Sequence, residues 1–428
     1  MRCFRCATPQ PVRCSRPDSE RRRWAEYGRV MSSESINSHL AHANDLEPSA
    51  GHARLREGCP LHTEESHDPP FHVVARHADV FDLVKRPEEW RNGAGVGINA
   101  QPRGVLGSSD DPDHRRQRRV LQDSFRPAAI ARLDAEVAIA GDTLWNRSFG
   151  RDGEGDFVRL FAFPFPAIVI AVLLGVPQDR RDDFGRWSND IVNTLGGADP
   201  SLAEAANTAI FALVDELVAD RIELHEHGEE MPDDVLSVMT RAELDGTLSH
   251  HEVRRLSQQL LVAGHETTAS LISLMLYRII EDPSLHRRLR DEPDLIASAV
   301  EEFLRYDSPV QGLFRSNPEP STVAGEVLPA DSRVQALFAS ANRDPAVFDR
   351  PDDIVLDRFA GKATTHLAFG WGVHHCIGAS LARREGELAL RWMVDRFETV
   401  ERTGDVEVNE PFILRGLTTL PIRWTVRT

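Results

Sequence analysis

The chain has 428 residues, of which 41% are hydrophobic, and this is enough apolar material for a large folded core. Acidic side chains outnumber basic ones by 67 to 50, so the net charge is −17 with histidine neutral. That balance argues against a nucleic-acid-binding protein, because tracking phosphates requires a cationic face. The sequence does not repeat at a fixed period, which excludes collagen and solenoid arrays.

The N-terminal residues differ in composition from the rest of the chain. Residues 1–30 contain eight arginines and three acidic residues, but they lack the apolar run of a signal peptide or membrane anchor. We therefore predict a disordered tail over residues 1–45 and one folded body over residues 46–428. The five cysteines are sparse and odd in number, which argues against a disulfide framework and favours a reducing, cytoplasmic location.

Hydrophobic spacing predicts a mostly helical body with smaller β-sheets. Apolar residues three and four positions apart predict long helices over residues 128–149, 202–225, 249–282 and 293–306. Ser249 followed by Glu252 is a capping-box start for the longest of them. The most apolar run, residues 160–176, predicts a short helix that is buried on all sides and ends at Gly175. Alternating stretches predict strands over residues 71–75, 322–327, 333–338 and 420–426.

The segment 369–385 reads F-G-W-G-V-H-H-C-I-G-A-S-L-A-R-R-E and contains one cysteine, Cys376. Two glycines before it permit tight turns that bring N–H groups near the sulfur. A helix that opens at about Gly378 adds positive potential, which lowers the thiol pKa and favours the thiolate. From these residues alone, two other interpretations stay open. One is a zinc site that includes the neighbouring histidines, and the other is a buried structural cysteine.

The whole string resembles the haem-binding loop of the cytochrome P-450 family, F-G-x-G-x-H-x-C-x-G-x-x-L-A-R-x-E, and it fills every fixed position. The resemblance implies that Cys376 is the axial thiolate ligand of haem b iron, where thiolate donation favours O–O bond cleavage. It also implies that Phe369 shields the sulfur, that His374 reaches a haem propionate and that Gly378 belongs to the haem-binding residues. The fold that it implies is a single triangular prism, mainly α-helical with smaller β-sheets.

A second motif lies inside the longest predicted helix, where residues 260–270 read L-L-V-A-G-H-E-T-T-A-S. Glycine and threonine are poor choices in mid-helix, and a threonine hydroxyl there can bond back to a carbonyl one turn earlier. On the residues alone this predicts a kink with a solvated Glu266. The string also resembles the family motif A-G-x-(D/E)-T-T. That resemblance implies that Ala263 and Gly264 leave room for O2, while Glu266 and Thr267 deliver protons.

A third motif, Glu302 and Arg305 in E-x-x-R, places an ion pair on one helix face. The pair precedes the cysteine within E-F-L-R-Y-D-S-P-V, which is similar to the equivalent family segment. The resemblance implies that Arg358 is its third member and that the three residues hold the loop that positions Cys376.

A fourth pair, His114 and Arg118, shares one helix face, so both side chains can donate to one anion. The family resemblance makes them haem-propionate ligands, with Arg315 as a third. The same helix carries Arg115, Arg116 and Arg119. We expect these three arginines to be exposed near Cys376 and to attract an acidic redox partner.

The resemblance implies a bacterial-type haem-thiolate monooxygenase that activates O2 and oxidises a small hydrophobic substrate. It also implies that electrons come from NAD(P)H through a ferredoxin reductase and a ferredoxin. The alternatives are a peroxide-driven peroxygenase and a non-catalytic haem-binding or sensor protein. Family analogy places substrate-lining residues at 96–106, 195–200, Ala263, 310–314 and 412–414. These are mostly aliphatic, which suggests a terpenoid, steroid, fatty acid or macrolide-like ligand.

Overall fold

The structure is a computed structural model that describes most of the predicted folded body. It describes residues 2–4, 13–15, 46–47, 50–65, 67–98, 104–195, 200–409 and 413–427. Within the predicted tail, β1 (Arg2–Phe4) and β2 (Arg13–Ser15) form an antiparallel pair. The rest of residues 1–45 lies outside the described residues, so disorder of the tail stays a prediction.

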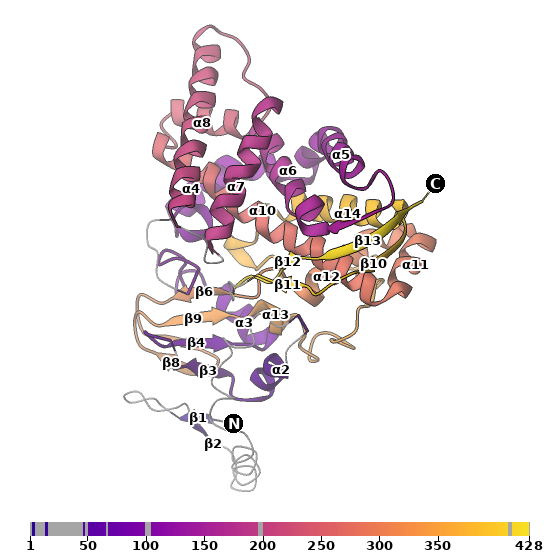
Figure 1. Cartoon of the computed structure of the whole chain (residues 1–428). Coiled ribbons are helices and arrows are strands. Elements are labelled where there is room, and N and C mark those ends of the chain that lie inside the picture. The colour runs from indigo at the N-terminus through magenta and orange to yellow at the C-terminus, as the bar shows by residue number, and fades with distance from the viewer. Residues whose placement is uncertain are drawn as a thin grey trace.

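Helices make up most of the described chain, as the hydrophobic spacing predicts (Figure 1). Their bounds are α2 (Ala50–Glu57), α3 (His77–Val84), α4 (Asp113–Leu121), α5 (Pro127–Phe149), α6 (Pro164–Leu174), α7 (Arg181–Leu195), α8 (Pro200–Glu226), α9 (Val235–Leu244), α10 (His250–Glu281), α11 (Pro283–Asp291), α12 (Ile296–Asp307), α13 (Phe338–Ala341) and α14 (Ala379–Arg396). The long helices predicted from the sequence correspond to α5, α8, α10 and α12.

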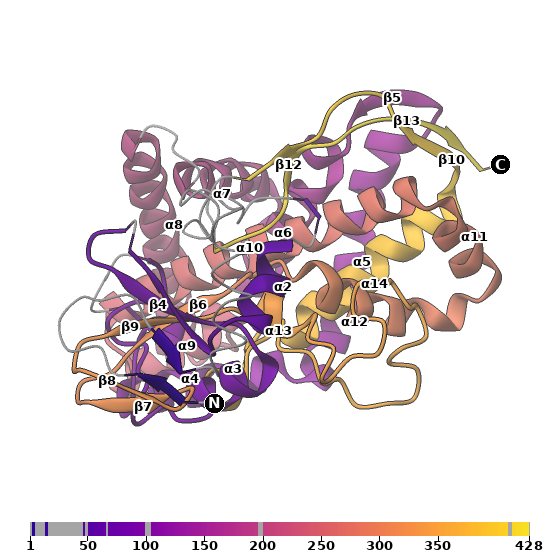
Figure 2. The same cartoon turned by 90° about the horizontal axis from the view of Figure 1, so that it is seen from below.

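α10 is the central helix of the fold. The Ser249 side chain accepts from the N–H of Glu252, and the Glu252 carboxylate accepts from the N–H of Ser249 at 2.9 Å, so the predicted capping box is confirmed. α10 packs against α6, α8, α12 and α14, and Figure 2 shows it beside α12 and α14 in the middle of the molecule. It is long and apolar enough to cross a membrane, but 78% of its apolar window is buried inside the protein.

The strands form small sheets that join distant parts of the chain. A four-stranded sheet has the order β3 (Leu61–Glu64), β4 (Phe71–Val74), β9 (Arg333–Ala336) and β6 (Leu313–Ser316), and it lies below α4, α7 and α10 in Figure 1. A three-stranded sheet has the order β10 (Phe397–Arg402), β13 (Pro421–Val426) and β5 (Gly153–Asp156). Two hairpin-like pairs join β7 (Ser321–Val323) to β8 (Glu326–Leu328) and β11 (Glu407–Val408) to β12 (Leu417–Thr419).

Two predicted strands differ from the structure. Residues 322–327, predicted as one strand, belong to the β7–β8 hairpin, because Ala324 (φ 50°) and Gly325 (φ 83°) turn the chain in the left-handed conformation. The strand predicted over residues 333–338 ends at Ala336, before α13 begins.

The apolar run over residues 160–176 forms a helix that is almost entirely buried, as predicted. A π-helical turn, η4 (Val158–Ala162), leads into α6. Gly175 ends α6 in the left-handed conformation (φ 73°), which glycine adopts without steric cost. This helix packs against α10 and so forms part of the support for the site.

Candidate active site

A cavity of about 380 Å³ lies between the middle of α10 and the cysteine loop, which comprises residues 369–378. Its apolar walls include the predicted substrate-lining residues Val96, Leu106, Ala263, Val310, Leu313, Ile413 and Leu414. Phe314 instead packs in a separate buried cluster with Phe71. Residues 99–103, 196–199 and 410–412 lie outside the described residues, and so does that part of the predicted lining.

The cysteine loop brings Cys376 to one wall of the cavity. Gly370 (φ 65°) and Gly372 (φ 72°) adopt the left-handed conformation that the predicted tight turns require. The N–H of Cys376 donates to the Phe369 carbonyl at 2.9 Å, and α14 begins directly after Gly378. A Cβ on Gly378 would lie 3.9 Å from the sulfur, so the backbone passes close to it.

The expectation of a lowered thiol pKa is wrong for the protein alone. Burial raises the pKa of Cys376 and outweighs the Gly378 N–H and the charges of Arg118 and Arg383, which act to lower it. The thiol nevertheless faces the cavity. A thiol coordinated to a metal ion is deprotonated outright. The enclosed sulfur therefore fits a cofactor whose metal supplies the missing positive charge.

Four basic side chains gather at one edge of the cavity: His114 and Arg118 from α4, Arg315 from β6 and His374 from the cysteine loop. The rings of His114 and His374 lie with their centroids 4.1 Å apart. Burial, with Arg315, His114 and Arg118, lowers the pKa of His374 to about 2. Burial also lowers the pKa of Arg315 to about 10.

This cationic edge fits the carboxylates of a haem. Nε2 of His114 and Nδ1 of His374 are buried and lack a hydrogen-bond partner. Asp111 lies beside the cluster, with its carboxylate 3.6 Å from His114. An unpartnered buried polar atom costs about 1–3 kcal/mol. A ligand with anionic groups at this edge would remove that cost and offset the positive charge.

The opposite wall is the middle of α10. Ala263 is exposed to the cavity although most of the helix is buried. The Thr267 hydroxyl donates to the Ala263 carbonyl at 2.7 Å, which is the bond one turn back that the sequence predicts. The structure gives a further reason for a glycine at position 264, because a Cβ there would lie 2.6 Å from the Ile170 side chain of α6. Glycine at this position therefore lets α10 pack on α6 without displacing the end of the Ile170 side chain.

Glu266 is buried, so the interpretation as a solvated side chain is wrong. Asn409 Nδ2 donates to Glu266 Oε1 at 3.3 Å, while Oε2 is buried without a partner. Burial raises the pKa of Glu266 to about 7, against the opposing effect of Asn409. The sequence does not single out Asn409, because it is 143 residues away and belongs to no motif. A carboxyl group with this pKa can exchange a proton near neutral pH.

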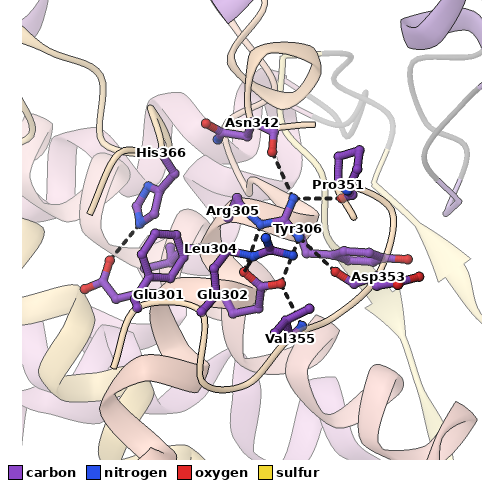
Figure 3. Close-up of polar contacts among 12 residues, drawn as sticks. Glu301, Glu302, Leu304, Arg305, Tyr306, Asn342, Pro351, Asp353, Val355 and His366 are labelled. Carbon is purple, nitrogen blue, oxygen red and sulfur yellow. Dashed lines mark hydrogen bonds and ion pairs between the residues drawn. The ribbon is translucent and has the colours of Figure 1, made fainter. Parts of the chain in front are cut away.

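The third motif forms a buried ion cluster around Glu302 and Arg305 (Figure 3). Glu302 and Arg305 are fully buried and make two hydrogen bonds of 2.8 Å. Arg358 donates to the same carboxylate at 2.9 Å. Arg305 also donates to backbone carbonyls of residues 342, 351 and 353. The cluster thus fastens α12 to the irregular chain that leads to Cys376.

The arginines of α4 do not all face solvent. Arg115 and Arg119 are exposed and border a surface hollow together with Gly372 and Val373 of the cysteine loop. Arg116 instead donates to the Glu252 carboxylate and to the Thr247 carbonyl, so it joins α4 to the start of α10. The expectation that Arg116 is free for a partner is therefore wrong.

Another contact that the sequence does not reveal supports the central helix. His265 is fully buried within α10, and its Nε2 lies 2.8 Å from the Phe163 carbonyl. Burial lowers the pKa of His265 to about 4. The ring is therefore neutral, donates from Nε2 and accepts at Nδ1 from the Ser188 hydroxyl of α7. Among the described residues, no group of three His, Cys, Asp or Glu side chains is arranged to hold a metal ion.

Comparisons with known proteins agree with the motifs. The family model of cytochrome P-450 matches residues 71–426. The chain is 34% identical over 88% of its length to a vitamin D(3) 25-hydroxylase of Pseudonocardia autotrophica, of which it covers 93%. It is 34% identical over 82% of its length to the erythromycin C-12 hydroxylase of Saccharopolyspora erythraea, of which it covers 88%. The solved structure of CYP109E1 from Bacillus megaterium in complex with testosterone matches 88% of the chain and 99% of its own, with a TM-score of 0.77 and 29% identity.

Proposed function

Because this chain belongs to the cytochrome P-450 family of haem-dependent monooxygenases, we propose that it inserts one oxygen atom from O2 into a small hydrophobic substrate. The predicted family, fold class and haem cofactor are confirmed by the family match and the structural similarity. The observation that carries the proposal is the cavity itself, because the Cys376 thiol, apolar walls and a cationic edge all line it.

The residues around the cavity suggest how haem is held. Cys376 would bind the haem iron through its sulfur, and Phe369 and Gly378 lie beside that sulfur. The basic edge of His114, Arg118, Arg315 and His374 would bind the propionates, and the unpartnered imidazole nitrogens of the two histidines support this role. Haem bound through a thiolate supplies O2 activation and cleavage of the O–O bond. Ala263 and Gly264 on the facing wall of α10 are small, so they leave room for O2 in the cavity.

Glu266 and Thr267 are the residues that we propose to manage protons in this cavity. Glu266 can gain and lose a proton near neutral pH, because burial raises its pKa to about 7. Asn409 orients its carboxyl group through one oxygen. The Thr267 hydroxyl lies one residue further along α10 and lines the same cavity. The apolar walls exclude water, so a specific path for protons is needed.

The substrate is a steroid-, terpenoid-, fatty-acid- or macrolide-like molecule. The aliphatic lining supports this class, and so do the printed names of the relatives, which mention vitamin D(3), erythromycin and testosterone. Electrons come from NAD(P)H through a ferredoxin reductase and a ferredoxin, and the protein acts in the cytoplasm. A screen of such compounds by difference spectroscopy tests the class, with charged polar compounds as the control. Spectral shifts with the charged compounds alone would contradict it.

The ligation of haem has a direct spectroscopic test. We expect the reduced protein to show, with CO, the red-shifted Soret band that is typical of a thiolate ligand. Cys376→His should abolish this band even if haem is retained. The matched control is Cys59→Ser, which changes a free cysteine that does not line the cavity. An unchanged band in Cys376→His would contradict the assignment of Cys376.

A further inference from the structure

A second ion cluster lies behind the cysteine loop and is not used in the proposed function. Glu301 of α12 accepts from Nε2 of His366 at 2.7 Å. It also pairs with the guanidinium of Arg383 in α14, whose Nη2 lies 3.3 Å from its carboxylate. Figure 3 shows the Glu301 carboxylate directed at His366, on the side away from the Glu302–Arg305 pair. Neighbouring glutamates of α12 therefore serve two separate clusters.

Hydrogen bonds around His366 and Glu301 indicate where the proton and the negative charge lie in this second cluster. The N–H of Ala368 donates to Nδ1 of His366 at 3.3 Å, so Nε2 of the ring carries the proton that is donated to Glu301. Burial acts to raise the pKa of Glu301, but the hydrogen bonds from His366 and Arg383 outweigh it and hold the pKa below its ordinary value. The carboxylate is therefore ionised and fixes the cation of Arg383.

Arg383 is linked to Cys376 by way of Phe369, which contacts both residues. Its guanidinium carbon lies 4.5 Å from the centroid of the Phe369 ring, which is a cation–π geometry. The Phe369 carbonyl in turn accepts the N–H of Cys376 at 2.9 Å. Arg383 is also one of two cations whose field acts on the Cys376 sulfur, together with Arg118. The positive charge of Arg383 is thus held near the Cys376 sulfur, although Arg383 does not line the cavity.

We propose that Arg383 is a positioning residue for electron transfer, whose charge, held on Phe369 by Glu301 and His366, raises the reduction potential of the bound haem. This rests on the proposed function, namely on Cys376 as the axial ligand. The step concerned is the transfer of one electron from an iron–sulfur ferredoxin to ferric haem, which gives ferrous haem with no proton moved. A nearby cation favours the state with the additional electron, and it does so more strongly inside the protein than in water.

The test is an equilibrium redox titration of the haem-loaded protein. At the potential where the wild type is half reduced, the ratio of reduced to oxidised protein should be about tenfold lower in Arg383→Gln. This corresponds to a reduction potential that is lower by about 59 mV for a one-electron couple. Glu301→Gln should shift the ratio in the opposite direction, because it removes the anion that offsets the cation. Arg383→Lys keeps the charge and should stay close to the wild type.

The adjacent arginine provides a matched control. Arg384 pairs with Asp134 of α5 and with Glu387, away from Phe369, so Arg384→Gln should leave the ratio unchanged. An unshifted Arg383→Gln, or equal shifts in Arg383→Gln and Arg384→Gln, would overturn the proposal. The same would follow from an Arg383→Lys shift as large as that of Arg383→Gln. If Arg383→Gln does not retain haem, the sign of the Glu301→Gln shift decides.

The CO spectrum of each variant separates this proposal from the proposed function. A thiolate-type band in every variant shows that ligation is intact, and the potentials then test Arg383 alone. A wild-type protein without that band would contradict the proposed function itself, and with it the premise of this inference.

Discussion

Glu266 is a buried carboxyl group whose charge depends on pH near neutrality. Because burial raises its pKa to about 7, above the ordinary value of 4.5, ionisation of this group opposes folding. The cost is absent below the ordinary value and is complete once the pH has risen through about 7. It amounts to about 3 kcal/mol, since one pKa unit corresponds to about 1.4 kcal/mol.

Glu266→Gln should therefore stabilise the haem-loaded protein at about pH 8.5 and change it little at about pH 5. Thermal unfolding at both values measures the difference, and the wild type at each pH is the reference. A stabilisation of equal size at both values would show that the carboxyl group stays neutral throughout.

Thr267 contributes a hydroxyl to the same wall of the cavity. We expect Thr267→Ala to bind substrate and consume NAD(P)H but to release mostly hydrogen peroxide, because a positioned proton donor typically contributes about 10²–10⁴-fold. NAD(P)H, peroxide and product are measured together. Thr267→Ser retains the hydroxyl and should remain coupled. Full coupling in Thr267→Ala would mean that the hydroxyl serves only its bond to the Ala263 carbonyl.

At the scale of the elements, the Glu302 cluster joins α12 to the chain that leads to the cysteine loop. Glu302→Gln leaves Arg305 and Arg358 without their buried carboxylate, and breaking such a pair costs about 3–5 kcal/mol. We expect a lower unfolding temperature and a smaller fraction of protein with the thiolate-type CO band. Glu154→Gln is the control, because its pair with Arg423 is exposed and exposed ion pairs contribute little to stability. Equal losses in the two variants would contradict a supporting role for Glu302.

The elements differ in how well local sequence determines them. The ends of α10 are predictable because the capping box and the apolar spacing are both local signals. The pairing of β5 with β13 is not, since it joins residues 153–156 to residues 421–424, and such pairing depends on tertiary packing. The β7–β8 turn is missed because Ala324 adopts a positive φ, which alanine rarely does.

The site shows the same division. The four motifs indicate Cys376, the basic edge, the α10 wall and the Glu302 cluster, because each is a run of neighbouring residues or a family pattern. The contact of Asn409 with Glu266 becomes visible only when the folded chain brings distant residues together. Arg383 and Phe369 both belong to the cysteine motif, but the motif does not specify the cation–π contact between them. The net pKa of Cys376 is also beyond local reasoning, because burial by the whole fold outweighs the adjacent helix N-terminus.

Across the whole molecule, a small cationic area stands out against a net charge of −17. Arg115 and Arg119 of α4 border the hollow shared with Gly372 and Val373. Next to it, Trp371 and Val373 are each 44% exposed, which is high for large apolar side chains. A face that combines exposed apolar groups with local positive charge suits an acidic electron donor, and it lies beside the loop that carries Cys376.

Arg119 is the better residue for testing this face, because Arg115 is paired with Asp111 and Arg116 with Glu252. We expect Arg119→Glu to lower the rate of reduction by ferredoxin by about tenfold at low ionic strength and by less at high salt, because screening weakens attraction between exposed charges. Arg423→Glu makes the same change of charge on β13, which lies across the molecule from α4 (Figure 1), and should leave the rate unchanged. Stopped-flow reduction over a range of salt concentrations measures both variants. A rate that depends on neither Arg119 nor salt would mean that the donor docks elsewhere and that these arginines form an ordinary solvated face.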